Sequence, residues 1–287
     1  MRLSTISMHG GERAAVVHHN AVMPLDTLNR LTGSHFPCDL FTLIQSGQLA
    51  QLNQWYRAEG ARWLEDRLEE MLPADRVTYA PLYRTPGKIL GIGLNYRDHA
   101  SDLNTPPPTQ YPGSFFKPAT TIIGHGDAIR LPALAENTTG EAELGVIFGR
   151  TCKDIQPEHW LDYVAGFTTI LDMTAEDLVR KNPRFLTMSK SFDTFFSFGP
   201  ELVTPDEVED VKALSIATVH NGAVYAENTV SHMHFTPDVL TALYSQVMPW
   251  QPGDILSTGT PRAVRLRPGD CVSCQITGFR PLVNPVA

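Results

Sequence analysis

From Lys88 to the C-terminus the sequence is a succession of short apolar runs divided by Gly, Pro, Asn and Asp, with few long helical patterns. Such spacing is typical of strands, whereas a doubly wound α/β fold would alternate strands with helices of about ten residues or more. Apolar residues make up 42% of the 287-residue chain, which is enough for a sizeable core. The pattern therefore predicts a mixed α/β, strand-rich fold of the roll or sandwich type.

The first 80 residues differ from the rest and predict a small N-terminal α+β domain over residues 1–80. Two short extended runs surround a Gly-Gly turn, and a helix-like stretch from residue 39 to residue 72 follows. A turn-rich segment, LPADRVTYAPLYRTPGK, then leads into the larger domain, residues 81–287. No concentrated chemistry is expected in the first domain, whose expected role is to pack against or cover the second.

Charge and cysteine content exclude several classes of protein. The 31 acidic and 23 basic residues give a formal net charge of −8, and Lys and Arg do not cluster, so nucleic acid is not an expected partner. No apolar run approaches the roughly 18 residues of a membrane span, and the N-terminus lacks the apolar core of a signal peptide, so no membrane association and a cytoplasmic location are expected. Cys271 and Cys274 form a C-x-x-C motif. Because residues three apart on a strand face opposite sides, a metal-binding or redox role is not expected for this pair.

Two acidic residues interrupt an apolar strand-like run. Glu141 and Glu143, in EAELGVIFGR, would project from the same face of a strand, about 7 Å apart. Burying both costs several kcal/mol unless a cation or proton neutralises them. The alternative is an edge strand whose solvent face is acidic. Asp172 is a third carboxylate, expected at a strand's end before a helix that Thr174 and Asp177 would cap, and an all-oxygen set suits Mg²⁺ or Mn²⁺ better than zinc.

A series of motifs carries a family resemblance. In order along the chain they are GIGLNYRDHASD, FFKP, EAELGV, Asp172, SKSFDTF and PGDILSTGTP. Over about residues 86–285 the sequence resembles the fumarylacetoacetate hydrolase superfamily. The resemblance implies a β-roll or sandwich core that binds Mg²⁺ or Mn²⁺ through Glu141, Glu143 and Asp172. It also implies a homodimer, and hence a catalytic metal-binding role for residues 81–287.

The resemblance assigns catalytic roles to Lys190, His99 and Asp102. Three carboxylates on a dication leave a net charge of −1, so an anionic substrate needs a nearby cation, and Lys190 matches the lysine that relatives place beside metal and substrate. His99 lies three residues before Asp102, on one face of a helical turn, where the carboxylate could orient the imidazole as a general base. Many relatives have Glu at the position of Asp102, whose side chain is shorter.

Further residues are expected to bind the substrate. Tyr96, Arg97 and Lys117 could contact an anion, and Thr258, Gly259 and Thr260 could present backbone N–H groups and hydroxyls to a substrate oxygen. The chain departs from many relatives in two places. It has Glu176 where they carry Arg, and its hairpin NGAVYAENT lacks their Gln, so recognition of the far end of the substrate stays open.

The leading functional prediction is a metal-dependent hydrolase that cleaves a carbon–carbon bond of a 2,4-dioxo acid of the acylpyruvate or fumarylpyruvate type, giving pyruvate and a carboxylate. The expected partner is thus a small anionic 2-keto acid, met in the breakdown of aromatic compounds. Isomerisation of 2-hydroxyhepta-2,4-diene-1,7-dioate and decarboxylation of oxaloacetate need the same enolate stabilisation without attack by water. A non-catalytic metal- or ligand-binding homologue is the alternative from another class.

Overall fold

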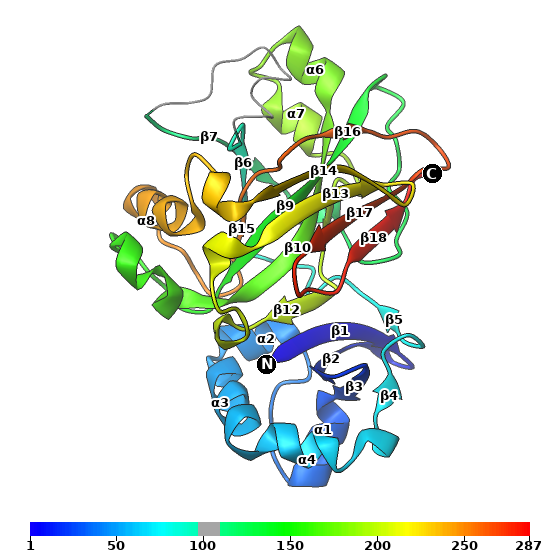
Figure 1. Ribbon diagram of the computed structural model, residues 1–287, viewed down its shortest axis with the longest axis vertical. Helices are drawn as coiled ribbons and strands as arrows, with labels where there is room; N and C mark the ends of the chain where they lie inside the picture. Colours follow the sequence, from blue (N-terminus) through cyan, green and yellow to red (C-terminus); the bar gives the residue numbers. More distant parts are fainter. Residues whose placement is uncertain (97–109) are drawn as a thin grey trace.

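The computed structural model describes residues 1–96 and 110–287 (Figure 1). The strands up to residue 148 are β1 (Arg2–Met8), β2 (Gly11–His18), β3 (Ala21–Pro24), β4 (Leu72–Pro73), β5 (Thr78–Tyr79), β6 (Ile89–Gly93), β7 (Gly113–Lys117), β8 (Ile122–Ile123) and β9 (Thr138–Phe148). The later strands are β10 (Val164–Ala175), β11 (Phe196–Phe198), β12 (Glu201–Val203), β13 (Ser215–His220), β14 (Ala223–Thr229), β15 (Ile255–Ser257), β16 (Val264–Arg265), β17 (Cys271–Ile276) and β18 (Leu282–Pro285).

The helices are short. The α-helices are α1 (Leu25–Thr32), α2 (Leu40–Gln45), α3 (Gln48–Trp55), α4 (Ala61–Glu65), α6 (Glu176–Lys181), α7 (Leu186–Lys190) and α8 (Pro237–Val247). A π-helical turn, η1 (Tyr56–Gly60), joins α3 to α4. Single 3₁₀ segments are η2 (Leu68–Glu70), η3 (Ala119–Thr121), η4 (Pro157–Tyr163), η5 (Pro205–Glu207), η6 (Val211–Ala213) and η7 (Val230–His232). None of the helices within the described ranges is both long and apolar enough to cross a bilayer.

Two sheets carry the fold of the described residues. Fourteen strands form the larger sheet, whose main path runs β4-β3-β2-β1-β12-β10-β9-β15-β6-β7. The smaller sheet has the order β14-β13-β17-β18 and packs over β9 and β10, as the yellow-to-red strands of Figure 1 show. The two sheets enclose one core, to which β9 contributes Ala142, Leu144 and Val146 and the smaller sheet contributes Ile216 and Val272.

The long antiparallel pair β9–β10 lies at the centre of this arrangement. Residues 138–148 are all buried, so the strand that carries Glu141 and Glu143 is not an edge strand with an acidic solvent face. Alternation places Ala142, Leu144 and Val146 toward the smaller sheet, and the two glutamates therefore point to the opposite side. The fold therefore buries both carboxylates on the face of β9 that points away from the smaller sheet.

The N-terminal residues join the same large sheet. β1 pairs with β12 in antiparallel register, with Leu3 opposite Leu202. Helices α1 to α4 cover the core on that side, where Leu28, Leu43 and Leu52 belong to the same buried apolar cluster as Phe198. Figure 1 shows this blue and cyan unit below the rest of the molecule. The mixed, strand-rich fold class predicted from the sequence is confirmed, and the boundary between residues 80 and 81 stays a prediction.

Candidate metal centre

The register of β9 and β10 brings the third carboxylate to the first two. Asp172 lies directly opposite Glu141 on the neighbouring strand, and Ile170 lies opposite Glu143. Residues opposite each other in an antiparallel pair project to the same side. Carboxylate oxygens of Glu141, Glu143 and Asp172 accordingly lie within 4.8 Å of one another. The three acids are almost fully buried, with Glu143 and Asp172 at 0% exposure and Glu141 at 8%.

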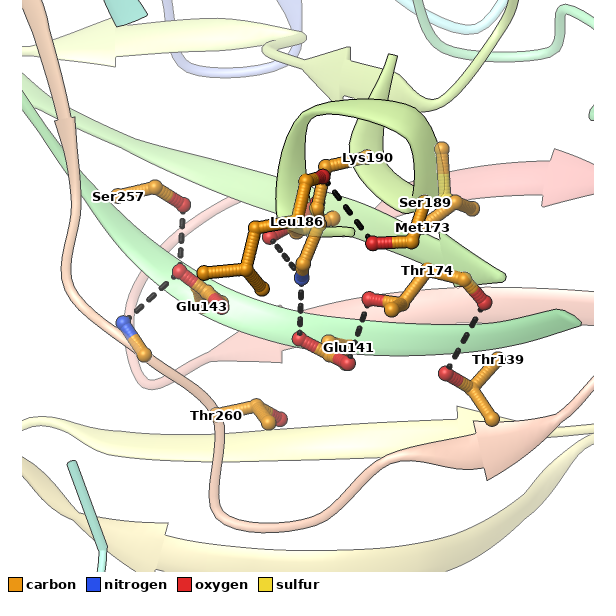
Figure 2. Close-up of polar contacts among 12 residues, drawn as sticks. Thr139, Glu141, Glu143, Met173, Thr174, Leu186, Ser189, Lys190, Ser257 and Thr260 are labelled. Carbon is orange, nitrogen blue, oxygen red and sulfur yellow. Dashed lines mark hydrogen bonds and ion pairs between the residues drawn. The ribbon is translucent and has the colours of Figure 1, made fainter. Parts of the chain in front are cut away.

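One oxygen of each carboxylate is fixed by the chain around it. Glu141 Oε1 accepts a hydrogen bond from Thr174 Oγ1 at 2.9 Å. Glu143 Oε2 accepts from the Ser257 hydroxyl and from the Gly259 N–H at 2.8 Å (Figure 2). Asp172 Oδ1 accepts from the Lys117 ammonium, which also donates to the Met173 carbonyl at 2.9 Å.

The second oxygens of Glu141 and Asp172 both lie beside Lys190. Lys190 Nζ lies 3.2 Å from Glu141 Oε2 and 2.7 Å from Asp172 Oδ2, reaching down from α7 toward β9 (Figure 2). Its ammonium also lies 4.3 Å from the centroid of the Phe115 ring, a distance suited to a cation–π contact. Glu143 Oε1 is buried and has no hydrogen-bond partner within residues 1–96 and 110–287.

The pKa shifts show which of the three carboxylates has too little positive charge nearby to stay ionised at neutral pH. Burial, reinforced by the charges of Asp172 and Glu141, raises the pKa of Glu143 to about 8. Burial also lowers the pKa of Lys117 to about 8, against the attraction of Asp172. For Lys190 the attraction of Asp172 and Glu141 outweighs burial and raises the pKa. Lys190 is therefore a permanent cation here, whereas Glu143 holds a proton at neutral pH until another positive charge arrives.

The residues present fit a divalent cation. With all three acids ionised, three carboxylates and two ammonium groups leave the centre with one excess negative charge, and Glu143 Oε1 is a buried oxygen with no partner among the described residues. One oxygen from each acid gives three ligands of the hard type that Mg²⁺ and Mn²⁺ prefer, and leaves room for others. The cluster could therefore hold a divalent metal ion.

The loop after β15 closes the centre from another side. Gly259 has φ +96°, and a Cβ there would lie 2.8 Å from Asn95 Cβ and 3.2 Å from the Ile92 carbonyl oxygen. Only glycine suits both the left-handed backbone and the close approach. Because this backbone brings the Gly259 N–H to Glu143, the glycine positions a ligand of the candidate centre.

Comparisons with known proteins agree with this architecture. Residues 88–287 match the family described as fumarylacetoacetate (FAA) hydrolase C-terminal, which is more than half of the chain. The chain belongs to this family. A human mitochondrial oxaloacetate tautomerase is 36% identical over 225 residues, which are 75% of this chain and 71% of that protein. These findings confirm the family resemblance seen in the sequence motifs.

Solved structures of fumarylacetoacetate hydrolase relatives cover the whole chain. Maleylpyruvate hydrolase from Sphingobium sp. SYK-6, in complex with manganese(II) and pyruvate, is 27% identical with a TM-score of 0.79, and the match covers 100% of this chain and 99% of that one. The 2-hydroxyhepta-2,4-diene-1,7-dioate isomerase from Mycobacterium marinum is also 27% identical, with a TM-score of 0.75 and coverage of 100% and 98%. Enzymes with different reactions thus share this fold.

Several residues expected to bind substrate are engaged by the chain itself. The Thr258 hydroxyl donates to the Leu144 carbonyl at 2.9 Å, and the Thr260 hydroxyl donates to the Arg262 carbonyl at 3.2 Å. The donors of Gly259 and Lys117 go to Glu143 and Asp172, as described above. In this family member the loop of residues 258–260 and Lys117 therefore support the acidic cluster, and their contacts with substrate stay predictions.

Tyr96 is buried, and its hydroxyl has no partner among the residues that the structure describes. Burial, with the nearby charge of Glu143, raises the pKa of Tyr96, so the phenol remains protonated and can donate. Arg97, His99 and Asp102 lie outside the described residues, and their roles stay predictions from the sequence.

The capping box expected at Thr174 and Asp177 is wrong. β10 continues to Ala175, and α6 begins at Glu176 without a side-chain cap. Thr174 lies two residues after Asp172 on the same face of the strand, so its hydroxyl reaches Glu141 instead of a helix N-terminus. Sequence reasoning also missed Ser257, since nothing in ILSTGT indicates that its hydroxyl meets Glu143 from 114 residues away.

At the position where many relatives carry Arg, the negative charge of Glu176 is balanced by a neighbouring residue of this chain. Glu176 Oε2 accepts a hydrogen bond from Asn137 Nδ2 at 2.8 Å, and Glu176 Oε1 accepts from Arg180 on the same helix. Glu176 therefore supplies no positive charge to a substrate.

Proposed function

We propose that this family member is a Mg²⁺- or Mn²⁺-dependent enzyme that acts on a small 2-keto acid through its enolate, and that its reaction is the keto–enol tautomerisation of oxaloacetate. The observation that supports it is the buried cluster of Glu141, Glu143 and Asp172, beside Lys190, with one carboxylate oxygen lacking a partner among the described residues.

The charge of the centre suits an anionic substrate. With Glu143 ionised, the three acids, Lys117 and Lys190 sum to one negative charge, which a dication converts to one positive charge. The bound ion would stabilise the negative charge that develops on the keto oxygen as the enolate forms. Lys190, freed in part from Glu141 and Asp172, would hold the substrate carboxylate. His99 would carry the proton between the substrate carbon and water, with Asp102 orienting its ring.

We place tautomerisation before hydrolysis because a tautomerase is among the relatives with the higher sequence identity. The human tautomerase is 36% identical over 225 residues, 75% of this chain, whereas the maleylpyruvate hydrolase and the isomerase are 27% identical in matches that cover 100% of it. Tautomerisation also needs fewer groups, since it moves one proton and no water attacks carbon. The hydrolysis of acylpyruvates is the second candidate, and its support is the match to the hydrolase over 100% of this chain. In that reaction His99 would deprotonate water instead.

One set of assays distinguishes these reactions. Enol-oxaloacetic acid, dissolved in a dry solvent and diluted into buffer, is mixed with protein and Mg²⁺ or Mn²⁺, and the loss of enol absorbance is followed. Pyruvate is measured in parallel with lactate dehydrogenase, from oxaloacetate and from a panel of acylpyruvates. We expect accelerated enol loss without pyruvate. Formation of pyruvate from acylpyruvates would show that the enzyme is a hydrolase and not a tautomerase. Formation of pyruvate from oxaloacetate would indicate a decarboxylase.

Variants connect the activity to the centre. Glu141→Gln should abolish the accelerated enol loss, whereas Glu136→Gln, an exposed glutamate shortly before β9, is the matched control and should retain it. His99→Ala should lower kcat by roughly 10²- to 10⁴-fold, the usual contribution of a positioned base. Full activity of Glu141→Gln or of chelator-treated protein would refute the metal-dependent mechanism. The homodimer and the cytoplasmic location remain part of this proposal.

A further inference from the structure

A second group of metal-type ligands lies in the N-terminal unit, where the sequence predicts no concentrated chemistry. His18 is the last residue of β2, His19 follows it in the turn to β3, and Glu65 ends α4. Glu65 Oε2 lies 3.0 Å from His18 Nε2 and 2.7 Å from His19 Nε2. One ligand atom from each of the three residues lies within 4.8 Å of the other two. These residues belong to no part of the acidic centre.

The backbone at His19 explains how two successive histidines meet. In an extended strand neighbouring side chains point to opposite faces. His19 instead has φ +51°, a left-handed conformation that is uncommon for a residue with a side chain. The two imidazole centroids consequently lie 4.3 Å apart. Histidine is one of the residues enriched in this conformation, and here the conformation lets both rings face Glu65.

The π-turn η1 brings the partners of His18 toward one side of the helix. Tyr56 and Glu65 are nine residues apart, which on an uninterrupted α-helix places them about 180° from each other. The extra residue of a π-turn reduces that angle to about 80°. Tyr56 Oη then lies 3.0 Å from His18 Nδ1 while Glu65 meets Nε2. Such turns occur frequently at functional sites.

We propose that His18, His19 and Glu65 form a second metal site, selective for zinc or a similar first-row transition dication. Two imidazoles and one carboxylate are the donor set of three-ligand zinc sites, whereas Mg²⁺ and Mn²⁺ prefer oxygen. With Nε2 of His18 on the ion, its Nδ1–H donates to Tyr56, which holds the ring in place as is usual for a metal-binding histidine.

The surroundings leave room for the remaining ligand. His18, His19 and Tyr56 form part of the wall of a pocket of about 540 Å³, which Arg2 and Arg280 also line and which is large enough for water as the fourth ligand. His18 is buried, while His19 and Glu65 are exposed, so the ion can enter without opening the core. An ion here joins the β2–β3 turn to α4, and it would therefore stabilise the N-terminal unit.

The test uses the full-length protein with the acidic centre saturated by excess Mg²⁺. Zn²⁺ binding is measured by calorimetry, and Co²⁺ by visible absorption, which is intense for low-coordinate nitrogen-containing sites and weak for octahedral oxygen sites. The variants are His19→Ala and Glu65→Gln, both at exposed positions. The matched control is His159→Ala, an exposed histidine whose Nδ1 lies 3.6 Å from Asp162 Oδ2 and which belongs to no such cluster of described residues.

We expect one Zn²⁺ per chain, an intense Co²⁺ spectrum, and a higher Tm with Zn²⁺ in the wild-type protein and in His159→Ala. His19→Ala and Glu65→Gln should bind Zn²⁺ at least roughly 100-fold more weakly and lose the rise in Tm. A far-UV circular dichroism spectrum and a cooperative unfolding transition like those of the Zn²⁺-free wild type would show that they are folded. Equal Zn²⁺ affinity in wild type and His19→Ala, or no Zn²⁺ binding by the wild type, would overturn the proposal. Because the assay does not measure keto-acid turnover, its outcome is independent of the proposed reaction.

Discussion

The substitution Glu143→Gln tests the electrostatics of the acidic centre most directly, because it imitates the protonated carboxyl group. The amide oxygen can keep the hydrogen bonds from Ser257 and Gly259, and the amide nitrogen takes the place of Oε1, which has no partner among the described residues. Metal-free Glu143→Gln should therefore fold, and its affinity for Mn²⁺ should be lost because a neutral amide replaces a charged ligand.

The pH dependence follows from the pKa of Glu143. Burial raises it from 4.5 to about 8 in the folded, metal-free protein, so folding binds a proton between these values. The contribution of Glu143 to the free energy of unfolding is therefore most favourable below about pH 4.5 and is lost as the pH rises to about 8. At 1.36 kcal/mol per pKa unit the whole loss is roughly 5 kcal/mol, and Glu143→Gln should lack it. For the same reason, Mn²⁺ binding at pH 7 should release about one proton in the wild type.

The assay is chemical denaturation of chelator-treated wild type and Glu143→Gln at several values between pH 5 and pH 8, with Glu136→Gln as control. We expect Glu143→Gln to gain stability relative to wild type as the pH rises, while the control follows the wild type. Calorimetry in buffers of different ionisation enthalpy gives the proton release. Parallel stability curves for wild type and Glu143→Gln, or unchanged Mn²⁺ affinity in the variant, would refute this electrostatic account.

Three other substitutions probe the supports of the centre. Lys190→Met should weaken oxalate binding in the presence of Mg²⁺ by roughly 10²-fold or more and, by leaving buried acids unpaired, should lower metal-free stability by about 3–5 kcal/mol, measurable by calorimetry and denaturation. Gly259→Ala should cost about 1–3 kcal/mol in denaturation, because its Cβ would meet Asn95 in a strained backbone. Thr174→Val should reduce Mn²⁺ affinity by about 10- to 100-fold in calorimetry, since Glu141 loses its hydrogen bond, while stability changes little.

What the sequence predicts about this centre depends on the range of each interaction. The two-residue spacing of Glu141 and Glu143 determines a shared face, because strand alternation is local. The proximity of Asp172 depends on the register of β9 with β10, which no local pattern determines, and it was predicted only through the family resemblance. The local capping signal predicts that the Thr174 hydroxyl caps a helix, but β10 extends to Ala175 and the hydroxyl therefore lies on the strand.

Contacts between segments distant in the sequence were not predicted either, because local patterns do not determine which segments pair. Ser257 and Gly259 hold Glu143 only because β15 lies beside β9, with Ser257 opposite Gly145. The pairing of His18 and His19 with Glu65 depends on a left-handed residue and a π-turn, and neither has a sequence signature strong enough to predict it.

The proposed mechanism gives Lys190 two successive partners, the acids and then the substrate, and this would link metal binding to substrate binding. In the metal-free protein its ammonium pairs with Glu141 and Asp172, and the other ammonium group beside these buried acids within residues 1–96 and 110–287 is that of Lys117. In the proposed mechanism a bound dication would take over that neutralisation, and the positive charge of Lys190 would become available to an anion. The ion would then contribute to substrate affinity twice, through its own charge and through the release of Lys190. Because linkage is reciprocal, an anionic substrate should strengthen metal binding by the same factor.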